Sequence, residues 1–169
     1  MSSDVAGDGS VPAASAGRYF EDFSVGLAFR SKGTIGVTAE RIKSFAEEFD
    51  PQPFHLDDAA ARETLLGGLS ASGWHTAAVA MRLIVDSDLG LSGHGAGVEI
   101  ESMRWRRPVQ AGDTLRVEGT VIETRASRSH ADRGIVKFRA VATNQKNEVV
   151  LEATHVMVVR RRKSASLSG

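Results

Sequence analysis

One nearly continuous apolar segment near the middle of the chain most limits the folds that this sequence can adopt. Residues 71–85 read ASGWHTAAVAMRLIV, with many helix-favouring residues and a single charge, on Arg82. A helix that is apolar on nearly all sides is normally buried, and its small alanines let a sheet approach closely. Trp74 and Met81 are therefore expected in the core, and His75 is expected to be a hydrogen-bonded core histidine.

Four segments after this helix alternate between apolar and polar residues with a period of two, the pattern of β-strands. They span residues 98–106, 114–124, 134–144 and 148–161. Turn residues separate them at 108–113, 127–133 and 144–147. One buried helix followed by several long antiparallel strands predicts an α+β domain in which the sheet wraps around the helix.

Shorter elements are expected before the central helix. Residues 39–49 are predicted to form an amphipathic helix with Thr38 as its N-cap. Its apolar side chains recur at the i, i+3, i+4, i+7 spacing, at Ile42, Phe45, Ala46 and Phe49. A strand is expected at residues 29–38. A second short helix is expected at residues 59–66, capped by Asp57 or Asp58.

Length and composition indicate one domain, because 169 residues, 41% of them hydrophobic, can bury one sizeable core. We expect residues 18–161 to form this domain. A small, polar and disordered N-terminal tail is expected at residues 1–17, and a C-terminal tail at residues 162–169. The N-terminal residues have no basic region leading into an apolar run, so a secretory signal is not expected.

Charge and cysteine content exclude several classes of function. The 21 lysines and arginines balance the 21 aspartates and glutamates, so no global field draws the protein to nucleic acid or to an anionic membrane. The absence of cysteine excludes disulfides, thiolate metal sites and cysteine nucleophiles. No stretch approaches the roughly 18 to 20 consecutive apolar residues that span a bilayer. A cytoplasmic location is the expectation.

The segment FDPQPFHLD at residues 49–57 places one carboxylate, Asp50, five residues before one imidazole, His55. Prolines on both sides of Gln52 favour extended or turn geometry, so both side chains are expected on a stiff loop rather than on a helix. Such a pair can hold one water, the minimum equipment for adding water across a carbon–carbon bond or removing it. A structural alternative stands beside this interpretation, because an aspartate before proline can simply close a turn and the histidine can cap the next helix.

Five motifs in the chain resemble those of the MaoC-like dehydratases, the family that includes the (R)-specific enoyl-CoA hydratases. They are YFEDFSVG, FAEEFDPQPFHLD, GGLSASGWHTA, WRRPVQAGDTL and NQKNEVVLEA, between Tyr19 and Arg161. The fourth recurs in hot-dog proteins generally. The resemblance implies the hot-dog fold, a long antiparallel sheet around a central α-helix, and a homodimer whose two sheets join edge to edge. It also implies acyl thioester substrates, carried by coenzyme A or an acyl carrier protein.

The family's functional positions can be carried over to this chain. The resemblance assigns the catalytic aspartate to Asp50 and the catalytic histidine to His55. It assigns to Gly73 the backbone amide that faces the thioester carbonyl at the start of the central helix. Well-known hydratases carry His-Gly at that helix start, whereas this chain carries Ser72-Gly73, which alters the pocket wall and leaves the substrate open. The residues expected to contact the substrate are Gly68, Leu69, Ser72 and Trp74.

A basic cluster surrounds Trp105 in the middle of the chain. Alternation along a strand places Arg104 and Arg106 on one face and Trp105 on the other. The functional hypothesis is that Arg106 and Arg107 contact the phosphates of coenzyme A, because exposed guanidinium groups suit phosphate geometry. The structural alternative is a solvated strand face.

The resemblance, taken with these residues, implies a hydro-lyase that interconverts a 2-enoyl-CoA and its (R)-3-hydroxyacyl-CoA, without a metal or redox cofactor. Asp50 and His55 would hold the water and divide the proton transfers, and the Gly73 amide would stabilise the enolate oxygen. Two alternatives stay open. A hot-dog thioesterase would act on the same substrates and release free coenzyme A. A non-catalytic acyl-thioester-binding subunit would bind them whether or not Asp50 is acidic.

Overall fold

Six antiparallel strands form one sheet in the computed structural model, which describes residues 17–91 and 93–163. The strand order is β1-β4-β5-β6-β3, and β2 also pairs with β4. The strands are β1 (Ala28–Arg30), β2 (Ile35–Gly36), β3 (Gly95–Trp105), β4 (Thr114–Ala126), β5 (Arg133–Thr143) and β6 (Val149–Arg160). The helices are η1 (Phe20–Asp22), α1 (Ala39–Phe49), α2 (Pro53–Leu56), α3 (Asp58–Arg62) and α4 (Gly73–Val85). Of the two predicted tails, all but Gly17, Arg162 and Lys163 lies outside the described residues.

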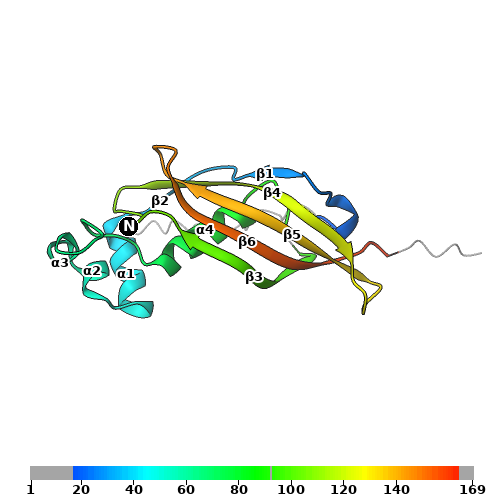
Figure 1. Ribbon diagram of the computed structural model, residues 1–169, viewed down its shortest axis with the longest axis horizontal. Helices are drawn as coiled ribbons and strands as arrows, with labels where there is room; N and C mark the ends of the chain where they lie inside the picture. Colours follow the sequence, from blue (N-terminus) through cyan, green and yellow to red (C-terminus); the bar gives the residue numbers. More distant parts are fainter. Residues whose placement is uncertain (1–16, 92, 164–169) are drawn as a thin grey trace, which may run out of the picture.

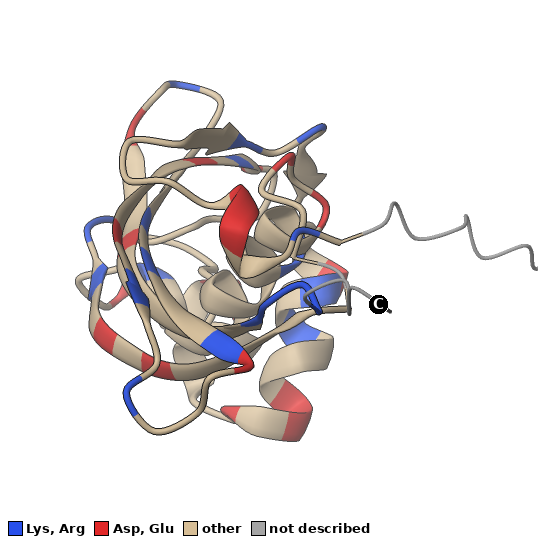
Figure 2. Ribbon diagram, turned by 90° about the vertical axis from the view of Figure 1, so that its right-hand side faces the viewer, with Lys and Arg blue, Asp and Glu red and all other residues tan. Residues whose placement is uncertain are grey.

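The sheet curves around α4, as the end-on view in Figure 2 shows. Residues of α4 that face the sheet are buried together with the inner faces of the long strands, because both surfaces are apolar. From α4 this core includes Val79, Ala80, Leu83 and Ile84, and from the strands Leu115, Val117, Val121, Val136, Phe138, Leu151 and Met157. The predicted α+β architecture, a sheet wrapped around a central helix, is confirmed.

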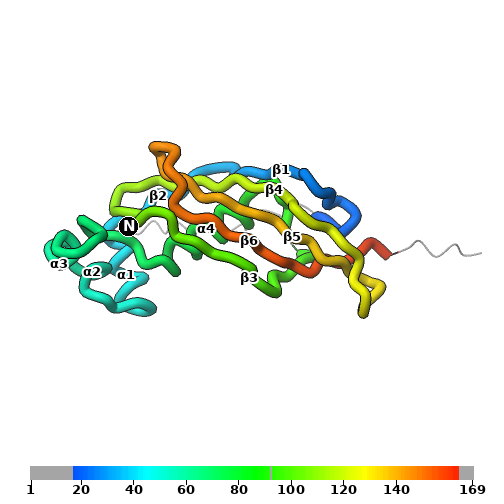
Figure 3. The backbone as a smooth tube through the Cα atoms, viewed as in Figure 1, coloured from blue at the N-terminus to red at the C-terminus, as the bar shows by residue number. Residues whose placement is uncertain are grey.

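The four long strands are confirmed, each starting and ending within three residues of its predicted bounds. The central strand β5 shows the expected alternation, with Val136, Phe138, Ala140 and Ala142 buried on the inner face. The helices α1, α2 and α3 cluster at one end of the sheet (Figure 1). The loop between β4 and β5 lies at the opposite end (Figure 3).

The predicted strand at residues 29–38 is wrong in its extent, because the chain forms two short strands, β1 and β2, in its place. A turn separates them, in which the Ser31 hydroxyl donates to the Gly33 carbonyl over 2.8 Å. Side chains that bond to nearby backbone in this way compete with strand pairing.

The predicted helix at residues 59–66 is also wrong in its extent, since α3 ends at Arg62. The Thr64 hydroxyl donates to the Ala61 carbonyl over 2.7 Å, and Leu65 is fully exposed. Extending the helix would therefore bury no apolar surface. Of the two expected caps, Asp57 is confirmed, because it accepts from the Ala60 N–H over 2.8 Å.

Trp74 and Met81 were expected in the core, and this prediction is wrong. Their exposed fractions are 63% and 40%. Both lie on a side of α4 that is largely open to solvent, together with Val85, which is also exposed, and the contact of this side with the sheet is that of Trp74 with Trp105. The edge strand β3 pairs only with β6, and the residues of β3 are exposed or half-buried along its whole length.

No helix in the described part of the chain has the length and apolarity needed to cross a bilayer.

Candidate active site

Asp50 and His55 meet at the end of the molecule where α1, α2 and α4 converge. Asp50 Oδ2 lies 3.5 Å from His55 Nε2. The His55 side chain is buried, and the Asp50 side chain is about one-fifth exposed. The structure therefore brings together the two residues that the sequence proposed as a proton-transfer pair.

Pro51 explains why the carboxylate sits where it does. A residue before proline is disfavoured in helical geometry, so α1 ends at Phe49 and Asp50 takes φ −153° and ψ 66° as its C-cap. The Gln52 N–H then donates to the Asp50 carbonyl over 2.7 Å. This tight turn directs the chain from α1 into the segment that carries His55.

The expectation that His55 lies on a non-helical loop is wrong. Residues Pro53 to Leu56 form the one-turn helix α2. Proline suits the first position of a helix, because its fixed φ is helical and its missing N–H would have no partner there. The second proline thus starts a helical turn, and this turn brings the imidazole back toward Asp50.

The tautomer of His55 follows from its second contact. His55 Nδ1 lies 2.7 Å from the carbonyl oxygen of Ser70. A carbonyl can only accept, so Nδ1 carries the proton, and Nε2 of the neutral ring is left as an acceptor toward Asp50. A water that lies beside these two acceptors can donate a proton to either of them.

Two side chains stabilise the ionised form of Asp50. Hydrogen bonding from the Ser72 hydroxyl and from the Gln52 amide lowers the pKa of Asp50, against a smaller opposing effect of burial. The Gln52 amide donates to Oδ1 over 2.7 Å, which leaves Oδ2 facing His55. Asp50 is therefore a carboxylate at neutral pH, with its Oδ1 held by Gln52.

Ser72 also fixes the start of α4. Its hydroxyl oxygen accepts from the Trp74 N–H over 3.2 Å as the N-cap, so the helix starts at Gly73 and not at residue 71. The first N–H groups of a helix have no partner within it and lie at its positive end. Because Ser72 contacts both Asp50 and this helix end, the carboxylate lies beside the amides of the first turn of α4.

The other residues expected at the substrate are less closely grouped. Ser72 is only 1% exposed, so it acts on Asp50 and the helix rather than on the surface of a pocket. Leu69 is buried, and its N–H donates to Asp58. Gly68 lies with Asp58, Arg62 and Gln110 around a separate open depression.

Arg106 and Arg107 are bound to glutamates rather than to the site. Arg106 donates to Glu152 over 2.8 Å, and Arg107 lies 3.8 Å from Glu148. Arg106 shares the outer face of the sheet with Arg104 and Arg139, whereas Trp105 faces α4. The predicted alternation along this segment is confirmed, and it places Arg106 on the face of the sheet opposite to α4.

A groove of about 440 Å³ runs along α1 beside the site. Its lining includes Phe45, Phe49 and His75, and Phe49 directly precedes Asp50.

The prediction of a hydrogen-bonded core histidine at His75 is wrong in one respect. The ring is buried and stacks on Phe45 at 4.9 Å, but its Nδ1 has no hydrogen-bond partner among the described residues.

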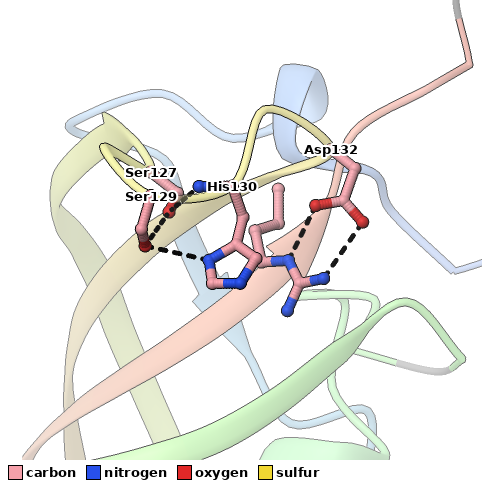
Figure 4. Close-up of polar contacts among 5 residues, drawn as sticks. Ser127, Ser129, His130 and Asp132 are labelled. Atoms are coloured by element: carbon pink, nitrogen blue, oxygen red, sulfur yellow. Dashed lines mark hydrogen bonds and ion pairs between the residues drawn. The ribbon is translucent and has the colours of Figure 1, made fainter.

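The loop between β4 and β5 holds a polar cluster that is remote from this site (Figure 4). His130 Nδ1 lies 2.9 Å from the Ser129 hydroxyl, and Arg133 pairs with Asp132 at 2.8 Å. The turn itself is closed by the Ser127 N–H, which donates to the Arg133 carbonyl over 3.1 Å. Across residues 17–91 and 93–163, no group of three histidine, aspartate or glutamate side chains is placed to hold a metal ion.

Two residues at the site were missed by the sequence interpretation. Gln52 was noted only as the residue between two prolines, although its closeness to Asp50 was a usable signal. Trp105 donates from its indole N–H to the Gly73 carbonyl over 2.8 Å. These two residues are 32 positions apart, and one sequence carries no local signal for such a contact.

Comparison with known proteins agrees with this geometry. A MaoC-like dehydratase from Rhodospirillum rubrum is 48% identical in sequence, with a TM-score of 0.82 over 88% of this chain and 100% of that one. The 3-hydroxybutyryl-CoA dehydratase of Methylorubrum extorquens is 31% identical over 150 residues, 87% of each chain. An R-hydratase from Pseudomonas aeruginosa, 23% identical with a TM-score of 0.70 over 90% of this chain and 95% of that one, has the same hot-dog fold. Residues 22–146 match the MaoC like domain, and the chain belongs to this family, which contains hydratases and dehydratases.

Proposed function

We propose that the protein is a hydro-lyase that reversibly adds water to a 2-enoyl-CoA to give the (R)-3-hydroxyacyl-CoA. The observation that carries this proposal is the 3.5 Å approach of Asp50 Oδ2 to His55 Nε2 beside the N-terminus of α4. Family membership supports the class of reaction. The similarity to a 3-hydroxybutyryl-CoA dehydratase supports short acyl thioesters as the first substrates to test.

In the proposed reaction, one water lies beside the carboxylate and the neutral imidazole. Its oxygen attacks the β-carbon while one of its protons passes to the Asp50–His55 pair. Electrons of the double bond move toward the thioester carbonyl, whose oxygen becomes negative. The Asp50–His55 pair then delivers that proton to the α-carbon, so that the product has gained the hydroxyl group and the hydrogen of one water and the pair returns to its starting state.

The first turn of α4 supplies the third requirement, stabilisation of the enolate oxygen. The Gly73 N–H, at the positive end of the helix, is the proposed donor. Loss of a donor in such a position typically costs on the order of 2.7–4 kcal/mol of barrier. Hydration transfers no electrons to an external carrier, so the proposed reaction uses no redox cofactor, and coenzyme A enters as part of the substrate.

We also propose a homodimer formed through β3 and the exposed side of α4. An edge strand has unpaired backbone groups that invite a second strand. Exposed apolar residues lie on both elements, namely Trp74, Met81, Val85, Val98 and Ile100. Two copies related by a twofold axis would join their β3 strands into one continuous sheet and cover these side chains.

The test is loss of the enoyl-thioester absorbance band when purified protein is mixed with crotonyl-CoA and a panel of longer and branched 2-enoyl-CoAs. Asp50→Asn and His55→Ala are run beside the wild type. Both variants are expected to lose at least about 100-fold in kcat, the usual size of a general acid–base contribution. Arg133→Gln, in the remote hairpin, is the matched control and should keep wild-type turnover.

The alternatives give different results in the same experiment. Release of free coenzyme A, detected with a thiol reagent, would identify a thioesterase. Binding without turnover, unaffected by Asp50→Asn, would identify an acyl-thioester-binding subunit. Either result would contradict the proposed hydro-lyase.

A further inference from the structure

We infer that Trp105 is a positioning residue for the Gly73 amide, holding the first turn of α4 in the place where it can receive the enolate oxygen. This inference rests on the proposed function, because it is the proposed role of Gly73 that makes the position of this peptide important. Trp105 has no place in the chemistry itself. It acts on Gly73 from the end of β3.

Two contacts join the indole to Gly73. The Nε1–H of Trp105 donates to the Gly73 carbonyl over 2.8 Å. The ring also lies flush against the Cα, since a Cβ added at Gly73 would be 2.9 Å from Cε2 and 3.0 Å from Nε1. Real Cβ atoms essentially never approach that closely, so only glycine at position 73 allows the indole to sit there.

The hydrogen bond is not needed to satisfy the carbonyl. Within an α-helix, the carbonyl of the first residue already accepts from the N–H four residues later. The indole therefore adds a second bond to a group that has a partner. Its effect is to fix the Gly73–Trp74 peptide, which shares the Gly73 Cα with the peptide that carries the proposed N–H donor, while Ser72 caps the same turn.

Trp105 is itself held by two neighbours. As the last residue of β3 it pairs in register with Leu151 of β6. Its ring meets Trp74 edge to face at 5.8 Å. The Gly73 peptide is thereby tied to the sheet, and not only to the helix that contains it.

Turnover of crotonyl-CoA by full-length Trp105→Phe tests this inference. Phenylalanine keeps an aromatic ring beside Gly73 but has no N–H to donate. We expect kcat to fall about 10- to 100-fold, because small misplacements of a catalytic group have effects of that size. KM should change less than about threefold, since the interaction matters mainly in the transition state.

A double-substitution cycle separates positioning from general support of the fold. Gly73→Ala keeps the backbone N–H but pushes the indole away, so it should also lower kcat. If both changes act through the same contact, the double variant Gly73→Ala, Trp105→Phe should be no slower than the slower single variant. Met103→Leu, on the same strand and face, is the control for disturbance of β3 and should keep wild-type kcat.

A second measurement reports the contact without any turnover. In ¹H–¹⁵N spectra, the indole N–H of Trp105 should exchange with solvent at least about tenfold more slowly than that of free tryptophan, because it is hydrogen-bonded. The Trp105→Phe spectrum assigns its signal. Exchange as fast as in free tryptophan would contradict the contact.

The results distinguish this inference from the proposed function. A wild-type protein that consumes no enoyl thioester overturns both. Normal wild-type turnover lost in Asp50→Asn, with Trp105→Phe as fast as the wild type, overturns the positioning role alone. Multiplicative losses in the double variant would do the same.

Discussion

The two sides of α4 have similar apolar composition but opposite surroundings. On one side, Val79, Leu83 and Ile84 are buried against the sheet. On the other, Trp74, Met81 and Val85 are exposed. The difference teaches that an apolar helix side indicates burial somewhere, while the surface that covers it must be found in the tertiary or quaternary structure.

The largest expected effect is the loss of folding stability when a side chain on the buried side of α4 is shortened. Ile84→Ala removes a side chain that is 1% exposed and should lower the free energy of unfolding by about 2–5 kcal/mol. Met81→Ala, the matched change on the exposed side, should cost much less in dilute protein. Urea unfolding of both variants checks this. Equal losses at low concentration would mean that the two sides are equally packed within one chain.

A charge on the exposed side should weaken the proposed dimer. Met81→Glu would place a carboxylate among apolar side chains, and we expect the dimer dissociation constant to rise at least about tenfold, or 1.4 kcal/mol. Sedimentation velocity across a concentration series measures this. Ile122→Glu, an equally exposed apolar residue on the outer face of the sheet, is the control. A monomeric wild type would refute the dimer.

Substitution of Ser72, at the N-terminal end of α4, should change both the stability of the protein and the pKa of Asp50. Ser72→Ala removes the N-cap, which should cost about 1 kcal/mol, and it removes the main contact that lowers the pKa of Asp50. The Asp50 pKa should therefore rise, which a ¹³C carboxyl titration can follow. Because a lowered carboxyl pKa stabilises the fold above the unfolded value of 3.8, the variant should also lose less stability on acidification. Ser72→Thr keeps the hydroxyl and should behave like the wild type.

The smallest expected effect is a pH dependence from His75. Burial, with a contribution from Arg41, lowers the pKa of His75, so the folded state favours the neutral ring. The neutral ring therefore contributes to the free energy of unfolding. This contribution is complete above 6.5, the pKa of His75 in the unfolded chain, and is lost as the pH falls through the lower pKa of the folded protein. Wild-type stability should therefore fall as the pH drops below 6.5, and His75→Phe, which keeps a ring against Phe45, should reduce the slope.

His155 is the natural comparison for that measurement, since burial also lowers the pKa of His155. His155→Phe should remove a further part of the slope. A His75→Phe protein with the wild-type slope would show that protonation of His75 does not oppose folding.

Much of the site was predictable because its signals are local. Asp50 and His55 lie five residues apart in one motif, and Thr38 and Asp57 cap helices whose patterns are clear. The errors arose where two local tendencies competed. The second proline was expected to break the helix, yet at the first helical position it begins α2.

The sequence by itself determined the class of fold, the long strands, the central helix and the placement of Asp50 and His55 in one short motif, because periodicity and short motifs act over a few residues. Only the tertiary structure decided that Trp105 rests on Gly73, that Ser72 acts on Asp50, that Arg106 lies on the face of the sheet opposite to α4, and that one side of α4 is left largely open to solvent. Each of these depends on segments far apart in the chain. Their meeting is set by how the whole sheet curves around the helix, and no local pattern records that curvature.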